Sequence, residues 1–110
     1  MSITVLDVAT IAARTKGAAS VRAFLNTNTV GAQLVEGEAI ELPAGERFAV
    51  EPGTRHQVVY VTAGQPSATF QGEVHDLRPG RGVYCEPGEG CELSATNGRA
   101  SFYLFTVARS

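Results

Sequence analysis

The chain of 110 residues is long enough to form one hydrophobic core and too short to form two. Its composition, 44% hydrophobic and 18% charged, is typical of a globular protein and excludes a disordered or fibrous chain. The formal net charge of -2 and the scattered positions of the nine basic residues argue against a nucleic-acid partner, because phosphate binding needs a clustered excess of Lys and Arg.

The N-terminal sequence MSITVLDVATIAARTKG does not resemble a secretory signal, because no basic region precedes an apolar block. No apolar run approaches the roughly 18 residues needed to span a bilayer. We therefore expect no membrane partner and a cytoplasmic location, where disulfides are rare.

The first expected element is a short helical stretch at residues 8–14, after a candidate Asp7 cap. Beyond about Gly31, glycine and proline recur too closely for helices of ordinary length, whereas short β-strands fit between them. These breakers are Gly31, Gly37, Pro43, Gly45, Pro52, Gly53, Gly64, Gly72, Pro79, Gly80, Gly82, Pro87, Gly88, Gly90 and Gly98.

The segments between the breakers carry strand-forming residues with a period of two. Strands are predicted at residues 57–62, 83–85 and 91–94, and a hairpin runs from 68–70 through Gln71 and Gly72 into 73–77. Residues 100–107 are apolar on both faces near their end, which predicts a central strand or one that faces a partner subunit. Short strands at regular spacing indicate a β-sandwich or a closed barrel.

Four segments resemble the scaffold motifs of the cupin superfamily. AGER at 44–47 resembles the turn before the first cupin motif, and VVYVTAG at 58–64 resembles its strand and closing glycine. PGR at 79–81 stands where the second motif has Pro/Ala-Gly-Asp, and YCEPG at 84–88 stands where an apolar strand ends in Pro-Gly. The similarity covers roughly residues 41–107.

This resemblance implies an all-β fold, the double-stranded β-helix of the cupin jelly-roll barrel, with a short N-terminal helical or extended segment. We expect a single domain over residues 1–110. Residues 30–110 would form the barrel, and residues 1–29 would pack on the barrel or on a partner subunit. Small cupins commonly form homodimers through such segments, so the resemblance also implies a homodimer.

The positions of the family's metal ligands carry other residues here. The family glutamate falls on Gln57, the two histidines of its HxH motif fall near Glu51 and Gly53, and its third histidine falls on Cys91. The resemblance therefore implies a degenerate metal site. If Gln57 points into the barrel, strand alternation turns His56 outward.

We accordingly expect no metal cofactor. If a divalent Fe, Mn, Ni or Zn ion is bound, its ligands would be Glu51, Gln57, His75 and Cys91. This set is unfavourable, because a thiolate favours zinc or iron whereas an amide oxygen is a poor ligand for either. An ordinary polar lining in a barrel without a metal ion is the favoured interpretation.

The candidate catalytic residues are His56, Gln57, Tyr60 and Glu51. An imidazole at His56 suits general-base chemistry near neutral pH, and the alternative is an exposed residue at the start of a strand. His75 shares a face with Leu77, which favours a partly buried structural histidine over a ligand.

The candidate ligand-binding residues are Tyr84, Glu86, Cys91 and His75. Glu86 belongs to an acidic turn around Cys91 that also contains Glu89 and Glu92, for which a solvated turn is the simpler explanation. Cys85 and Cys91 flank this turn. They could be two small core residues, part of a soft-metal site or the two halves of a disulfide, and the first interpretation is favoured.

The glycine-rich segments at 79–82 and 88–90 lack the lysine, the Ser/Thr and the helix that a P-loop requires, so we interpret them as turns.

Three functions are consistent with these features. The favoured one is a small cupin that binds an organic metabolite in its barrel and, if it is an enzyme, catalyses a metal-independent isomerisation, cyclisation or lyase-type reaction. The alternatives are a metal-dependent, dioxygenase-like or lyase-like enzyme with a remodelled site, and a non-catalytic module that binds a small molecule.

Overall fold

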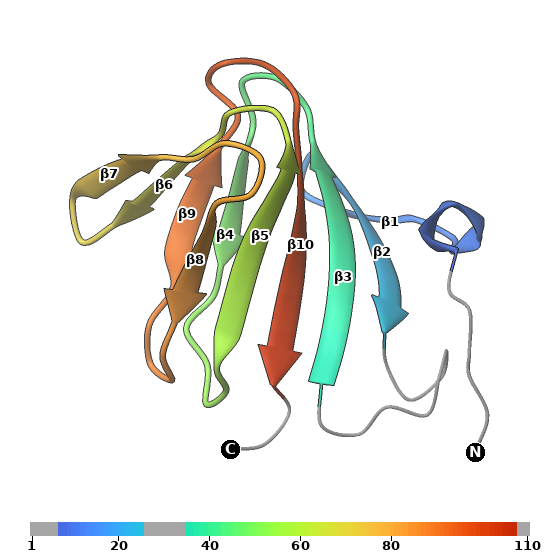
Figure 1. Cartoon of the computed structure of the whole chain (residues 1–110), viewed down its shortest axis with the longest axis horizontal. Coiled ribbons are helices and arrows are strands. Elements are labelled where there is room, and N and C mark those ends of the chain that lie inside the picture. The colour runs from blue at the N-terminus through green and yellow to red at the C-terminus, as the bar shows by residue number, and fades with distance from the viewer. Residues whose placement is uncertain (1–6, 26–34, 108–110) are drawn as a thin grey trace.

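The computed structural model describes residues 7–25 and 35–107, which form two antiparallel sheets (Figure 1). The elements are η1 (Val8–Thr10), β1 (Arg14–Lys16), β2 (Ala19–Leu25), β3 (Val35–Leu42), β4 (Arg47–Val50), β5 (Gln57–Ala63), β6 (Ser67–Phe70), β7 (Glu73–Asp76), β8 (Gly82–Cys85), β9 (Cys91–Ser94) and β10 (Ala100–Val107). One sheet has the strand order β1-β2-β3-β10-β5-β8, and the other has the order β4-β9-β6-β7. This is the predicted all-β jelly-roll architecture.

The core lies between the inner faces of the two sheets. Phe102 of β10 and Leu93 of β9 are fully buried, and the Phe48 ring of β4 meets the Phe102 ring edge-on, with 5.6 Å between their centroids. Burying each such side chain contributes about 1.5–3 kcal/mol, which makes these residues the main link between the sheets. The inner face of β5 adds Val59 and Val61, which are also fully buried.

Most of the strands predicted from the sequence are confirmed. β5, β8, β9 and β10 lie where the period-two pattern places them, and β10 is a central strand between β3 and β5. The predicted hairpin is formed by β6 and β7, which project from the side of the barrel (Figure 1). Gln71 and Gly72 both have positive φ, as a two-residue hairpin turn requires.

The predicted helix at residues 8–14 is shorter than expected. Only Val8–Thr10 forms one 3-10 turn, and the Asp7 carboxylate caps it by accepting a hydrogen bond from the Ala9 backbone N–H at 3.1 Å. Arg14 instead begins β1 and pairs with Val21 of β2, so strand pairing overrides a weak local helix preference. In the part of the chain that the structure describes, no helix has the length and apolar character to cross a membrane.

The N-terminal segment contributes directly to the larger sheet. β2 pairs with β3 along most of its length, and Ala19 and Val21 are buried in the core. β1 and β2 are therefore strands of the larger sheet itself, whereas the sequence predicted a segment that packs on the barrel or on a partner subunit. The expected boundary between residues 29 and 30 lies outside the described residues.

We predict that Gly64→Ala destabilises the fold more than Gly72→Ala. Both glycines have φ near +80°, so each alanine carries a penalty of about 1 kcal/mol for the left-handed backbone. A Cβ at Gly64 would also lie 2.4 Å from the Arg99 carbonyl oxygen, whereas a Cβ at Gly72 has nothing within 4 Å. The expected loss is about 2–4 kcal/mol for Gly64→Ala, measured by urea unfolding. Equal losses in the two variants would contradict the close backbone approach at Gly64.

Candidate functional site

A cavity of about 160 Å³ opens where an edge strand of one sheet lies near an edge strand of the other. These edges are β7 and β8. We call the space the thiol cavity, because its wall contains both cysteines of the chain. Its lining residues are Phe70, His75, Val83, Tyr84, Cys85, Glu89 and Cys91.

The turn between β8 and β9 brings the two cysteines together. Cys85 ends β8 in the larger sheet, and Cys91 begins β9 in the smaller one. The turn is held by the Gly88 backbone N–H, which donates to the Gly53 carbonyl at 2.7 Å. The Glu89 carboxylate accepts from the Glu86 backbone N–H at 2.9 Å. The chain therefore crosses between the sheets with both thiols turned inward.

Cys85 and Cys91 are buried free thiols that hydrogen-bond to each other. Burial raises the pKa of Cys85, and it raises the pKa of Cys91 to about 12, with the neighbouring Cys85 adding to the effect. Both thiols are therefore protonated at neutral pH, where a thiol is a weak nucleophile. Their place in the core cluster agrees with the interpretation that the sequence favoured.

Gln57 lies on the inner face of β5 with Val59 and Val61, which is the register that the alternation argument required. Its side chain is half-buried, and its Nε2 donates to the backbone carbonyl of Glu51 at 2.9 Å. The Glu51 side chain is exposed. The amide thus holds the loop before β5 in place through its N–H group.

His56 lies beside Gln57 and pairs with Tyr84. Its Nδ1 is 2.5 Å from the Tyr84 hydroxyl oxygen, and the two ring planes are within 6° of each other. Val58 is the strand partner of Tyr84, so this pair lies along the outer face of β5 and β8. Tyr60 is on the same outer face and is 44% exposed, on the opposite side of β5 from Gln57. The structure therefore joins His56 to Tyr84, and it separates Tyr60 from Gln57.

His75 lies on β7, where every residue is exposed, although its side chain lines the thiol cavity. The partial burial expected from its spacing to Leu77 is absent, because β7 is an edge strand with one neighbour. Glu86 is exposed, and the cavity is lined by Glu89 of the same turn.

Phe70 and Val83 also line the thiol cavity, and they are not among the ligand-binding residues predicted from the sequence. The pattern assigned both to strands. Only the pairing of those strands shows that these side chains reach the opening between the sheets.

The residues proposed as metal ligands do not fit a metal ion. The Gln57 amide is bonded to backbone, the Glu51 and His75 side chains are exposed, and Cys91 is buried in the core cluster. Across residues 7–25 and 35–107, no three His, Cys, Asp or Glu side chains are grouped as a metal site would require.

Comparisons with known proteins agree with this architecture. Residues 35–108 match the family model described as the AraC-like ligand binding domain. No protein with a curated description matches the chain at a significant level.

Several solved structures share the fold at low sequence identity. The polyketide cyclase RemF from Streptomyces resistomycificus is 14% identical with a TM-score of 0.86, and the similarity covers 98% of this chain and 81% of that one. KdgF from Halomonas sp. is 11% identical with a TM-score of 0.82, covering 97% and 96%. A Cupin 2 conserved barrel domain protein from Salinispora arenicola is 19% identical with a TM-score of 0.76, covering 97% and 88%.

The raised pKa of Cys91 predicts a loss of stability in alkaline solution. Between about pH 9 and pH 12 the unfolded chain releases a thiol proton that the folded chain keeps, so the free energy of unfolding falls as pH rises through this window. Below pH 9 Cys91 makes no contribution to the pH dependence. Urea unfolding across the window should show a shallower fall for Cys91→Ala than for the unmodified chain. Parallel curves for the two proteins would contradict the assignment.

Proposed function

Because the chain belongs to the AraC-like ligand-binding domain family of the cupin superfamily, we propose that it binds a small organic molecule in the thiol cavity. The observation that carries this proposal is the composition of the cavity wall. Phe70, Val83 and the two protonated thiols supply apolar surface, and the polar groups of His75 and Glu89 lie in the same wall. Apolar walls with a few polar groups are typical of small-molecule sites.

The size of the cavity limits the ligand. A cavity of roughly 150 Å³ takes up a molecule of about benzene's size, and the thiol cavity has about 160 Å³. The part of the ligand that enters it is therefore a small ring or a short chain. A hydroxyl, carbonyl or amino group on that part can hydrogen-bond to His75 or Glu89.

The comparisons support a ligand-binding barrel without assigning a reaction. The matching family is described by ligand binding, and the solved relatives include a polyketide cyclase and KdgF. At identities of 11–19%, those structures support the fold alone. The homodimer and the cytoplasmic location stay predictions from the sequence.

We predict that Val83→Phe weakens ligand binding and that Val74→Phe does not. Val83 lines the thiol cavity, so a larger ring there fills it, whereas Val74 is 63% exposed and lies outside its lining. A library of compounds of benzene's size, each with one polar group, would be screened by thermal unfolding. Each kcal/mol by which the bound ligand stabilises the fold raises Tm by about 4–8 °C. We expect about tenfold or greater loss of affinity for Val83→Phe. Equal affinity in the two variants would place the ligand elsewhere.

A second candidate function, metal-independent proton transfer, is favoured by the hydrogen bond between His56 and Tyr84. Tyr84 belongs to the lining of the thiol cavity, and its ring lies on the outer face of β8, where its hydroxyl oxygen contacts His56 Nδ1. A ligand that extends from the cavity over this edge of the sheet can therefore reach the pair. The Tyr84 oxygen would take a proton from an acidic C–H of the ligand as its own proton passes to His56 Nδ1. The electron pair stays on the ligand as an enolate, and return of the proton to another carbon completes an isomerisation.

Removal of a ligand proton by Tyr84 and its later return would also serve the cyclisation or lyase-type chemistry expected from the sequence. Gln57 and Glu51 support the loop that precedes His56, through the bond between the Gln57 amide and the Glu51 carbonyl. A catalytic role for Tyr60, which lies on the outer face of β5, stays a prediction.

Exchange of ligand C–H protons with deuterated water tests this second function. For a carbonyl compound selected by the thermal screen, the protein should speed the exchange seen by proton NMR. Tyr84→Phe should reduce the exchange rate by about 100-fold, the usual effect of losing a general acid or base, while thermal stabilisation by the ligand persists. Tyr103→Phe removes a hydroxyl from another tyrosine of the same sheet and should leave the rate unchanged. Unchanged exchange in Tyr84→Phe would leave binding as the function.

A further inference from the structure

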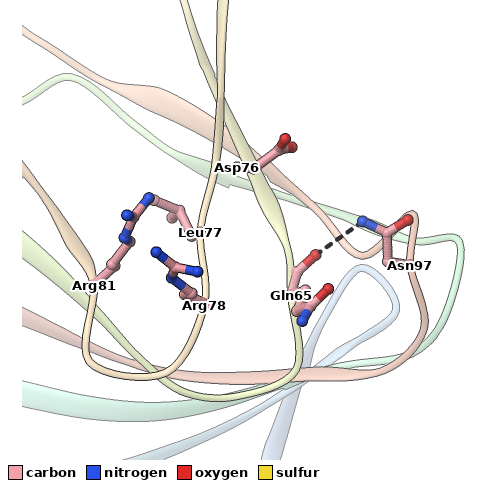
Figure 2. A pocket seen from close by; sticks show the side chains of 6 residues that line it. All are labelled: Gln65, Asp76, Leu77, Arg78, Arg81 and Asn97. Carbon is pink, nitrogen blue, oxygen red and sulfur yellow. Dashed lines mark hydrogen bonds between the residues drawn. The ribbon is translucent and has the colours of Figure 1, made fainter.

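A second cavity, of about 240 Å³, lies beyond the end of β5 opposite to Gln57 (Figure 2). Three connections meet there: the β5–β6 turn, the segment from β7 to β8, and the β9–β10 turn. We call it the arginine pocket. Its lining residues are Gln65, Asp76, Leu77, Arg78, Arg81 and Asn97.

Arg78 and Arg81 differ from the other described arginines in having no partner. The guanidinium groups of Arg14, Arg47, Arg55 and Arg99 form ion pairs with glutamates, and that of Arg22 donates to a backbone carbonyl. Within residues 7–25 and 35–107, Arg78 and Arg81 make no ion pair and no side-chain hydrogen bond. Two cations of a chain with a net charge of -2 thus line one pocket, and neither forms an ion pair with a described residue.

The segment that carries the two arginines is fixed by backbone hydrogen bonds. The Gly80 N–H donates to the Val61 carbonyl at 3.0 Å, and the Val61 N–H donates to the Arg81 carbonyl at 2.9 Å. The Leu77 N–H donates to the Pro66 carbonyl at 2.8 Å, and the Leu77 side chain is buried. A loop held at three points presents its side chains from defined positions, which lowers the entropy lost on binding.

The remaining lining groups are polar. The Asn97 Nδ2 donates to the Gln65 carbonyl at 3.3 Å, a bond that joins two of the three connections (Figure 2). The Asp76 carboxylate is the negative group in the lining. Figure 2 shows it on the other side of the backbone trace from the two guanidiniums. The charge at the arginine end of the pocket is therefore positive.

We propose that the arginine pocket binds an oxyanion, the phosphate or carboxylate group of a small molecule, between Arg78 and Arg81. Guanidinium groups bind such anions through paired, charge-assisted hydrogen bonds, which are about twice as strong as neutral ones. A phosphate dianion gains more than a carboxylate from two guanidiniums, so phosphate binds more tightly. This anion site uses arginine side chains on a turn, whereas a P-loop, which the sequence excludes, binds phosphate through backbone N–H groups of a glycine-rich loop.

The body of the bound molecule has room to extend from this pocket. A groove along β7 and β8 shares Asp76, Leu77 and Arg81 with the arginine pocket, and it continues to His75 and Val83. The oxyanion site is separate from the thiol cavity and does not depend on the function proposed for that cavity.

Inorganic phosphate and acetate are the probes that test this proposal. Each would be titrated into the full chain near neutral pH at constant ionic strength, with chloride as the balancing anion, and binding would be followed by thermal unfolding and calorimetry. We expect phosphate to stabilise the chain more than acetate. Arg78→Gln and Arg81→Gln should each weaken phosphate binding about tenfold or more, the loss expected for a hydrogen bond to a charged group.

Two further variants make the test specific. Arg47→Gln removes the same charge from an exposed arginine that is paired with Glu92, and it should leave phosphate affinity unchanged. Asp76→Asn removes the negative charge from the pocket and should tighten phosphate binding. Urea unfolding without phosphate checks that Arg78→Gln and Arg81→Gln are folded. Equal stabilisation of the unmodified chain and both arginine variants, or no stabilisation beyond that of chloride, overturns the proposal.

Discussion

The structure depends on contact between the inner faces of two sheets, centred on Phe48 of β4 and Phe102 of β10. This contact requires that the strands lining it keep their register, because a shift by one residue would turn the buried side chains of a strand toward solvent. In β5 the same alternation places Val59 and Val61 in the core and Tyr60 outside it. The register that closes the core therefore also decides which side chains can reach the barrel interior.

Both candidate binding regions lie where this closure is incomplete. β7 and β8 are edge strands, and the thiol cavity opens between them. The arginine pocket lies where three connections leave the strands at the other end of β5. At the cavity, inward side chains are partly desolvated, which raises the pKa of Cys91. In the arginine pocket, the Arg78 and Arg81 side chains are exposed to solvent. One framework thus presents an apolar region and a cationic region of different chemistry.

The strands near the site could be predicted from the sequence more completely than the site itself. The pattern of β5 predicted that Gln57 shares a face with Val59 and Val61, and the burial along β5 agrees. The pairing of His56 with Tyr84 could not be predicted, because it depends on the register between β5 and β8, which are separated by a hairpin in the other sheet. The exposure of His75 was missed for a similar reason, since spacing along a strand does not reveal that the strand is an edge.

The sequence by itself determined the all-β architecture and the positions of the later strands. These features are local, since glycine, proline and period-two patterns act within a few residues. Tertiary structure alone decided that residues 14–25 join the larger sheet and that the two thiols meet. It also decided that Arg78 and Arg81 line one pocket and that neither forms an ion pair with a described residue. Such contacts join segments far apart in the chain, and their energies depend on burial and distance that no local pattern records.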